Sequence, residues 1–261
     1  MRIINKVRQM YKSHRKSTVS ANWSWLYVAL IVSGQCHDLY AGDVNNSFRF
    51  ELTPYLWAAT IKGTTAVDGE ESPPIDSGYS FFALDNLDGV ASVNFTARKN
   101  KWGFLFDYLY VAYEDTFLEA TPLQTTTRLE GTIIEFAGAY APASIDSVEF
   151  IAGLRQQDIN VSLALLDRKP ERSVTWIDPF VGIIYTRPLT GSLHIALRGD
   201  IGGFGIESDK AVNAEAMFRY QMSDTFSLKF GYRYIKVTFE DTDFLYDISL
   251  DGFQIGLGIR F

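Results

Sequence analysis

Residues 252–261 read Gly-Phe-Gln-Ile-Gly-Leu-Gly-Ile-Arg-Phe, and this stretch does most to define the fold. An apolar side chain stands at every second position, with glycine or a polar residue between. Because successive side chains of a β-strand point to opposite faces of its sheet, the alternation predicts a strand with one apolar face and one polar face. The apolar face consists of Phe253, Ile255, Leu257, Ile259 and Phe261.

The same alternation recurs through most of the chain. In residues 226–234, for example, Phe, Leu and Tyr alternate with Ser, Lys, Gly and Arg. One alternating segment of about ten residues is a weak signal for a membrane β-barrel, but its repetition is a strong one. The sequence predicts strands at residues 47–64, 88–99, 102–116, 125–141, 147–160, 173–187, 191–204, 210–221, 225–240 and 244–261.

Two kinds of connection alternate between these strands. Short polar turns are expected at residues 99–101, 142–146, 188–191 and 222–224, and longer or more acidic connections lie between them. This order is typical of an up-and-down barrel with short turns at one end and loops at the other. We therefore predict an all-β, transmembrane antiparallel barrel of about 10 strands, with 8 or 12 as alternatives. The apolar pattern changes face after Tyr234, which indicates either a bulge or the edge of a membrane.

The composition excludes other classes of protein. Hydrophobic residues make up 47% of the 261 residues and aromatic residues 15%, too much for an intrinsically disordered chain. The one continuously apolar run, residues 23–32, is about half of the length that a membrane-spanning helix needs. The single cysteine, Cys36, leaves no internal disulfide to form.

The first 41 residues have the character of a signal peptide. Six basic residues and no acidic one precede the apolar run, and small residues follow it, with cleavage expected between Gly34 and Ala41. An amphipathic anchor is the alternative. Residues 42–261 then form a single barrel domain with 18 basic and 30 acidic residues. Its net charge of −12 argues against nucleic acid as a partner.

A last strand that alternates in this way and ends in Phe261 resembles the assembly signal of Gram-negative outer-membrane barrels. Residues 53–57, 176–182 and 197–203 look like segments of the same superfamily, in an OmpA/OmpW-like or porin-like branch. The resemblance covers residues 46–261. It implies an outer-membrane location, contact with outer-membrane lipid and lipopolysaccharide, and assembly through periplasmic chaperones and the barrel-assembly machinery.

A secreted β-sandwich or a lipocalin-like barrel would also alternate, but with its apolar face inward. The polar face here is rich in glycine and in charges of both signs, which suits a lumen. Aromatic residues lie near the strand ends on the apolar face, as in the girdle of a membrane barrel. Both features favour the membrane. The girdle consists of Phe48, Trp102, Tyr140, Tyr185, Tyr220, Phe226 and Phe261.

If the apolar face contacts lipid, the polar face places charges of both signs in the lumen. They form either a structural network of ion pairs or the wall of a narrow, water-filled pore. The charges expected to line the lumen are Glu51, Arg98, Asp107, Glu135, Arg155, Asp178, Arg198, Asp200, Glu215, Arg219 and Arg233, together with Arg49, Glu149, Lys229 and Arg260.

Three functions remain open at this point. A narrow channel for small solutes is the first, and a non-conducting structural or interaction barrel of the envelope is the alternative. An outer-membrane enzyme is a distant third, because His194 is the only histidine after residue 41 and is expected at the end opposite the outer rim. We expect no cofactor and no metal site, since one histidine and no cysteine leave only oxygen ligands.

Overall fold

The computed structural model describes residues 47–67, 70–72, 74–76, 87–117, 125–145, 147–165 and 170–261. The predicted signal peptide lies outside the described residues. No helix in the described part of the chain is long and apolar enough to cross a membrane.

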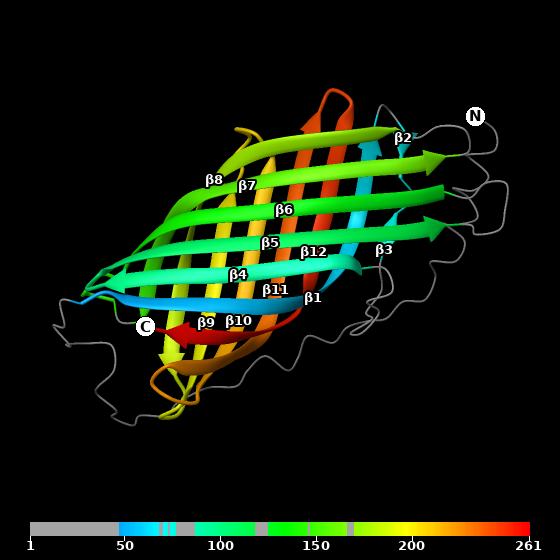
Figure 1. Ribbon diagram of the computed structural model, residues 1–261. Helices are drawn as coiled ribbons and strands as arrows, with labels where there is room; N and C mark the ends of the chain where they lie inside the picture. The colour runs from blue at the N-terminus through cyan, green and yellow to red at the C-terminus, as the bar shows by residue number, and fades with distance from the viewer. Residues whose placement is uncertain are drawn as a thin grey trace, which may run out of the picture. The chain divides into compact units, whose positions relative to one another are not determined.

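Ten long antiparallel strands form one closed sheet in sequence order, and β12 pairs with β1 to close it (Figure 1). This confirms the predicted up-and-down barrel of ten strands. Two short strands, Glu70–Glu71 (β2) and Ile75–Asp76 (β3), pair with β1. The long strands are Arg49–Val67 (β1), Leu87–Lys99 (β4), Trp102–Phe117 (β5), Thr125–Tyr140 (β6), Val148–Leu165 (β7), Glu171–Pro188 (β8), Leu193–Gly202 (β9), Lys210–Gln221 (β10), Phe226–Asp241 (β11) and Phe244–Arg260 (β12).

The barrel has two distinct ends. β1 begins and β12 ends at the same one, where Phe50 and Phe261 exchange two backbone hydrogen bonds of 3.2 Å. The short connections after β4, β6, β8 and β10 lie there too. We call it the turn end, and the opposite one the loop end.

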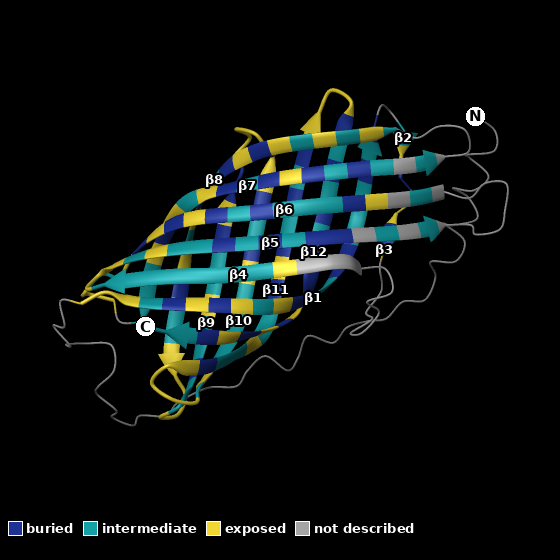
Figure 2. Cartoon of the chain, in the orientation of Figure 1, coloured by how far each residue is buried: buried dark blue, intermediate teal, exposed yellow. Residues whose placement is uncertain are grey.

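Large apolar side chains are exposed on the outer face of the half next to the turn end, and they alternate with inward residues along each strand (Figure 2). A soluble monomer rarely exposes so continuous an apolar surface. An outward apolar band is instead the mark of a transmembrane barrel. This apolar belt includes Phe48, Leu52, Leu56, Trp102, Phe104, Phe136, Tyr140, Phe150, Leu154, Ile177, Val181, Ile183, Leu197, Ile201, Tyr220, Phe226, Phe230, Tyr234, Phe253, Ile255, Leu257 and Phe261.

Beyond the belt, the chemistry of the two faces is reversed. On β11 the inward residues change from Lys229 and Arg233 to the buried Ile235, Val237 and Phe239. The pairing of β11 with β12 runs without a shift along this whole length. The change of pattern after Tyr234 is therefore not a bulge. It marks the edge of the belt, beyond which water rather than lipid surrounds the barrel.

The loop half is consequently built like a soluble two-layer protein. Strands β4–β8 form one layer, and β1, β11 and β12 cross behind it (Figure 1). Trp176 on β8 stacks on Phe239 on β11 with ring centroids 4.4 Å apart. The Cα atoms of β1 and β7, which are not neighbours in the sheet, come within 8 Å of each other. This apolar core consists of Trp57, Ile61, Val67, Ile75, Leu109, Val111, Leu129, Ile133, Ile159, Val161, Trp176, Ala211, Ile235, Val237, Phe239, Phe244, Tyr246, Ile248 and Leu250.

Candidate functional site in the barrel lumen

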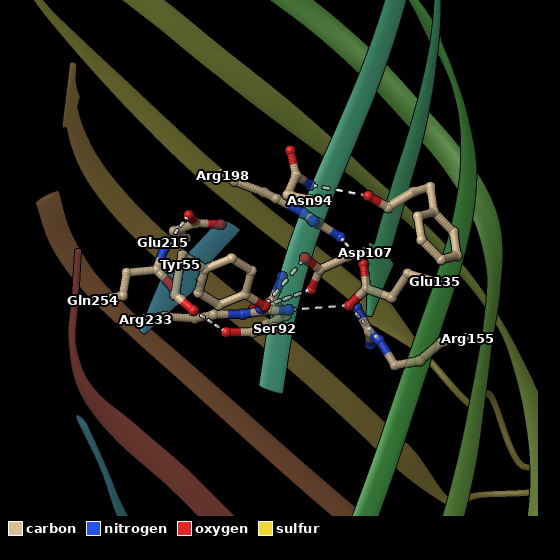
Figure 3. A network of polar contacts seen from close by, with 12 residues as sticks. Tyr55, Ser92, Asn94, Asp107, Glu135, Arg155, Arg198, Glu215, Arg233 and Gln254 are labelled. Carbon is tan, nitrogen blue, oxygen red and sulfur yellow. Dashed lines mark hydrogen bonds and ion pairs between the residues drawn. The ribbon is translucent and has the colours of Figure 1, made fainter. Parts of the chain in front are cut away.

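Arg155 on β7 lies in the middle of the lumen, and its side chain is 0% exposed. Its Nε donates a hydrogen bond to Glu135 Oε1 on β6 at 2.9 Å, and its Nη2 donates to Asp200 Oδ1 on β9 at 2.7 Å. Figure 3 shows Arg155 and Glu135 meeting inside the barrel. One guanidinium group thus joins three strands.

Arg198 on β9 contacts the same two carboxylates. Its Nη2 donates to Glu135 Oε2 at 2.7 Å, and its Nε donates to Asp200 Oδ2 at 2.9 Å. Each carboxylate is therefore held between two guanidinium groups. Charge-assisted hydrogen bonds of this length are among the strongest in proteins.

Arg233 extends the contacts to the opposite wall. Its Nη2 donates to Glu135 Oε1 at 3.1 Å, and its Nη1 donates to Asp107 Oδ2 on β5 at 3.0 Å (Figure 3). The formal charges of the group cancel, because three arginines meet three carboxylates. We call these six residues the central network: Asp107, Glu135, Arg155, Arg198, Asp200 and Arg233.

Two neutral side chains complete the central network. Asn213 on β10 donates to Asp200 Oδ2 at 2.8 Å and accepts from Arg233 Nε at 3.2 Å. The hydroxyl group of Tyr55 on β1 lies 3.1 Å from Asp107 and accepts a hydrogen bond from Arg233 at 3.3 Å. Both residues lie on the polar face of their strands, but a pattern argument that singles out charges overlooks such neutral partners.

Aromatic rings cover the central network. The guanidinium carbons of Arg155 and Arg198 lie 4.8 Å and 5.7 Å from the ring centroid of Phe180, and that of Arg233 lies 5.4 Å from Trp57. Guanidinium groups at these distances are attracted to the face of an aromatic ring. The rings also occupy space that water would otherwise fill.

Asp178 on β8 is buried separately, between the central network and the apolar core. It accepts hydrogen bonds from Trp176 Nε1 at 3.0 Å, Gln157 Nε2 at 3.2 Å and Ser208 Oγ at 2.7 Å. Ser208 belongs to the connection between β9 and β10, yet it is fully buried. Sequence reasoning missed it, because residues 205–209 resemble an ordinary acidic loop.

The turn end carries smaller groups of charges. Arg98 forms two hydrogen bonds to Glu149, of 2.9 Å and 2.7 Å. Glu51 pairs with both Lys229 and Arg260, the latter at 2.9 Å.

The structure thus distributes the predicted lumen charges over several groups. Six of the eleven form the central network, and they come from five strands. Glu51 and Arg98 lie near the turn end, and Asp178 near the apolar core. Glu215 accepts a hydrogen bond from Gln254 at 2.6 Å, and Arg219 faces inward opposite Lys229. Of the additional charges, Arg49 is exposed at the start of β1.

The ionic groups differ in how strongly the barrel depends on them. Removing one partner of a buried pair typically costs about 3–5 kcal/mol, because the other charge is left without compensation. Exposed pairs contribute about 0–1 kcal/mol. The central network, with side chains at most 11% exposed, belongs to the first class.

His194 and Asp200, both on β9, do not form a catalytic pair. His194 lies at the turn end of β9, whereas Asp200 is bound to Arg155, Arg198 and Asn213. Within the described residues, no cluster of three or more His, Cys, Asp or Glu side chains could hold a metal ion.

Comparison with known proteins gives matches only at the level of architecture. No protein-family model matches the sequence, and no curated protein matches it. The solved structures similar to this chain include Ail, the attachment invasion locus protein of Yersinia pestis, with 12% identity and a TM-score of 0.38. That match covers 82% of this chain and 98% of Ail.

Two further solved structures have different roles. The outer-membrane protease OmpT from Escherichia coli matches with 8% identity and a TM-score of 0.47, over 83% of this chain and 98% of OmpT. The translocator domain of the autotransporter NalP from Neisseria meningitidis matches with 11% identity and a TM-score of 0.42, over 84% and 90% of the respective chains. These likenesses concern the fold alone. The transmembrane assignment rests on the apolar belt of the chain itself.

Proposed function

We propose that the protein is an integral outer-membrane barrel that does not conduct ions or solutes, and that it acts through the part beyond the membrane. The observation that carries this proposal is the filling of the lumen. The central network spans it within the belt, and the apolar core fills it in the loop half. This favours the structural or interaction barrel over the channel for small solutes.

An aqueous pore needs side chains that water can reach. Arg155 and Asp200 have side chains that are 0% exposed, and that of Glu135 is 3% exposed. An ion that followed this route would have to separate paired charges and then cross the apolar core. Both steps oppose permeation, because desolvating a charge in apolar surroundings is costly.

The location and the partners belong to the same proposal. The apolar belt supports contact with outer-membrane lipid and lipopolysaccharide. The face that ends at Phe261 supports assembly by periplasmic chaperones and the barrel-assembly machinery. Outer-membrane barrels have their short turns on the periplasmic side, so the turn end should face the periplasm and the loop end the outside of the cell. Small solutes are partners only under the channel hypothesis.

The loop half supplies the surface for interaction. Strands β7 and β8 extend past the belt with outward polar residues such as Asp158 and Thr175, over a packed apolar core. A core of this size holds the outer surface in one shape, which a binding surface requires. A chain that needed only to stay in the membrane would not need strands of this length.

Solute release from proteoliposomes tests the proposal. Vesicles that contain the heat-modifiable, folded protein should lose entrapped glucose and potassium no faster than vesicles without protein. The double substitution Glu135→Ala with Arg155→Ala removes the centre of the network but leaves the apolar core. It should still give no release. Release by the wild-type protein would overturn the proposal and restore the channel.

A further inference from the structure

The outer wall of the barrel is hollowed over strands β5 to β10, within the apolar belt. An open groove of about 900 Å³ lies there between exposed apolar side chains. We call it the belt groove. Clefts that hold ligands have volumes of about 300–1,000 Å³ and mainly apolar linings. The belt groove has this size and character, and it is continuous with a surface that contacts the hydrocarbon of the membrane.

Small residues form the floor of the belt groove. Gly138 on β6 pairs with Ala152 on β7, and Gly199 on β9 pairs with Ala214 on β10. A Cβ atom added at Gly138 or at Gly199 would meet no other atom within 4 Å, so the space above both backbones is open. The floor is therefore lower than the rest of the belt, where large side chains project outwards.

Large side chains stand beside this floor. The pairing of neighbouring strands places Trp102, Tyr140, Phe150 and Ile183 in one row that ends at Gly199. All four large side chains are exposed. An acyl chain in the groove would touch them along its flank as well as the floor below it. Each additional contact between heavy atoms adds dispersion attraction, which a chain lying on a convex wall would lack.

The belt groove has no lysine, arginine or histidine in its lining. Its one charged lining residue, Asp200, points into the lumen and is bound to Arg155 and Arg198. A phosphorylated group such as lipid A needs arginine or lysine donors for its phosphates. The lining therefore suits a hydrocarbon chain and not a phosphorylated sugar.

Aromatic residues place one side of the groove at the level of lipid headgroups. Trp102 is the first residue of β5 and Tyr140 the last of β6, both at the turn end, and their ring centroids are 4.8 Å apart. Trp and Tyr gather at the interface between membrane and water. A chain that enters the groove beside them therefore belongs to a lipid of the leaflet next to the turn end.

We propose that the belt groove binds one acyl chain of a phospholipid from this leaflet. In the orientation given under the proposed function it is the periplasmic leaflet. The site lies on the outer wall, so it does not depend on whether the lumen conducts.

Native mass spectrometry of the full barrel, purified from outer membranes in a mild non-ionic detergent, tests this proposal. The wild-type protein should retain one phospholipid after its detergent has been removed by collisions. A barrel without lipid, or one that retains lipid A instead, would overturn the proposal. A dimer joined at the groove would also overturn it, because a second copy of the chain would then be the occupant.

Two separate variants, Gly138→Leu and Gly199→Leu, fill the groove with an apolar side chain. Both should fold, because neither glycine has a positive φ and the space above each is open. Heat-modifiable mobility checks the folding. Each variant should lose the retained phospholipid, whereas the control Ala91→Leu, on the outer face of β4 and outside the groove, should keep it. Folded groove variants that retain phospholipid as the wild type does would overturn the proposal.

Trp102 reports on the groove in a bilayer. It is 67% exposed, whereas Trp57 and Trp176 face the lumen and are each 3% exposed. A small share of phospholipid with brominated acyl chains should quench Trp102 more than random mixing predicts, and Gly138→Leu should return the quenching to the random level. Phosphatidylethanolamine and phosphatidylglycerol should quench alike, since no cation lines the groove. Random quenching in the wild type, or quenching by phosphatidylglycerol alone, would overturn the assignment to an acyl chain.

Discussion

Arg233 on β11 donates a hydrogen bond of 3.0 Å to Asp107 on β5, a residue 126 positions earlier in the chain. The contact joins opposite walls of the barrel within the apolar belt. The backbone hydrogen bonds of the sheet connect only neighbouring strands, so this side-chain pair adds a direct connection across the lumen. The same residues therefore both close the lumen and stabilise the barrel.

Breaking the central network should destabilise the barrel strongly. Arg155→Ala leaves Glu135 and Asp200 short of a cation, and we expect a loss of about 3–5 kcal/mol in the free energy of unfolding. Reversible urea unfolding in lipid vesicles measures it. Arg128→Ala removes an exposed arginine and should cost about 0–1 kcal/mol. Equal losses in the two variants would show that the lumen is wet.

Charge on the outer face should be tolerated beyond the belt but not within it. Phe230→Arg should cost about 2–4 kcal/mol, because Phe230 faces lipid between Phe226 and Tyr234. Asp158→Arg, on the outer face of the loop half, should change the free energy of unfolding little. The belt is misplaced if Asp158→Arg is as costly as Phe230→Arg in the same lipid.

The C-terminal face should govern assembly. Deletion of Phe261, or Phe261→Asp, should block insertion into the outer membrane while leaving export intact, since this residue completes the apolar face of β12. Fractionation and the heat-modifiable mobility of the barrel report the outcome, with Met222→Asp in a turn as the control. Normal amounts of inserted Phe261→Asp barrel would refute this expectation.

One ion pair in the loop half should make a pH-dependent contribution. Partial burial would raise the pKa of Asp247, but hydrogen bonds from Lys236 and Thr238 hold it below its ordinary value. The pair therefore stabilises the folded state at neutral pH, and this contribution is lost as the pH falls through the lowered pKa. Because both side chains are partly exposed, Asp247→Asn should cost only about 0–1 kcal/mol at pH 7.

The test is the difference in unfolding free energy between the wild-type protein and Asp247→Asn, measured at intervals from pH 7 towards pH 3. The difference should shrink as the pH falls. A difference that grows in acid would contradict the assigned direction of the shift.

Much of this fold could be predicted from the sequence, because alternation is a local property. The ten strand ranges differ from the predicted ones by at most a few residues at most ends. Alternation also predicts which charges share a face. It says nothing of which charges meet: Arg155 and Asp200 lie on the two strands that flank β8, and the tilt and register of these strands bring them together.

The closed lumen depends on features that a single strand does not reveal. From Ile235 onward the inward residues of β11 are apolar instead of charged. This change indicates an apolar core only because β1, β7 and β8 place apolar residues at the same level of the lumen. Ser208 reaches Asp178 because the backbone of the connection turns back on itself through positive φ angles at Gly203, Phe204 and Gly205. Neither the apolar core nor the contact between Ser208 and Asp178 can be read from a pattern in one stretch of sequence.

The central claim is that the lumen is closed, and single-molecule recording in planar bilayers tests it most directly. Purified, heat-modifiable wild-type protein should produce no discrete conductance steps in concentrated potassium chloride at either polarity. The reason is that the central network and the apolar core leave ions no aqueous path. Reproducible unitary steps from the wild-type barrel, with an ion selectivity that changes in Arg198→Ala, would contradict the claim and identify the protein as a channel.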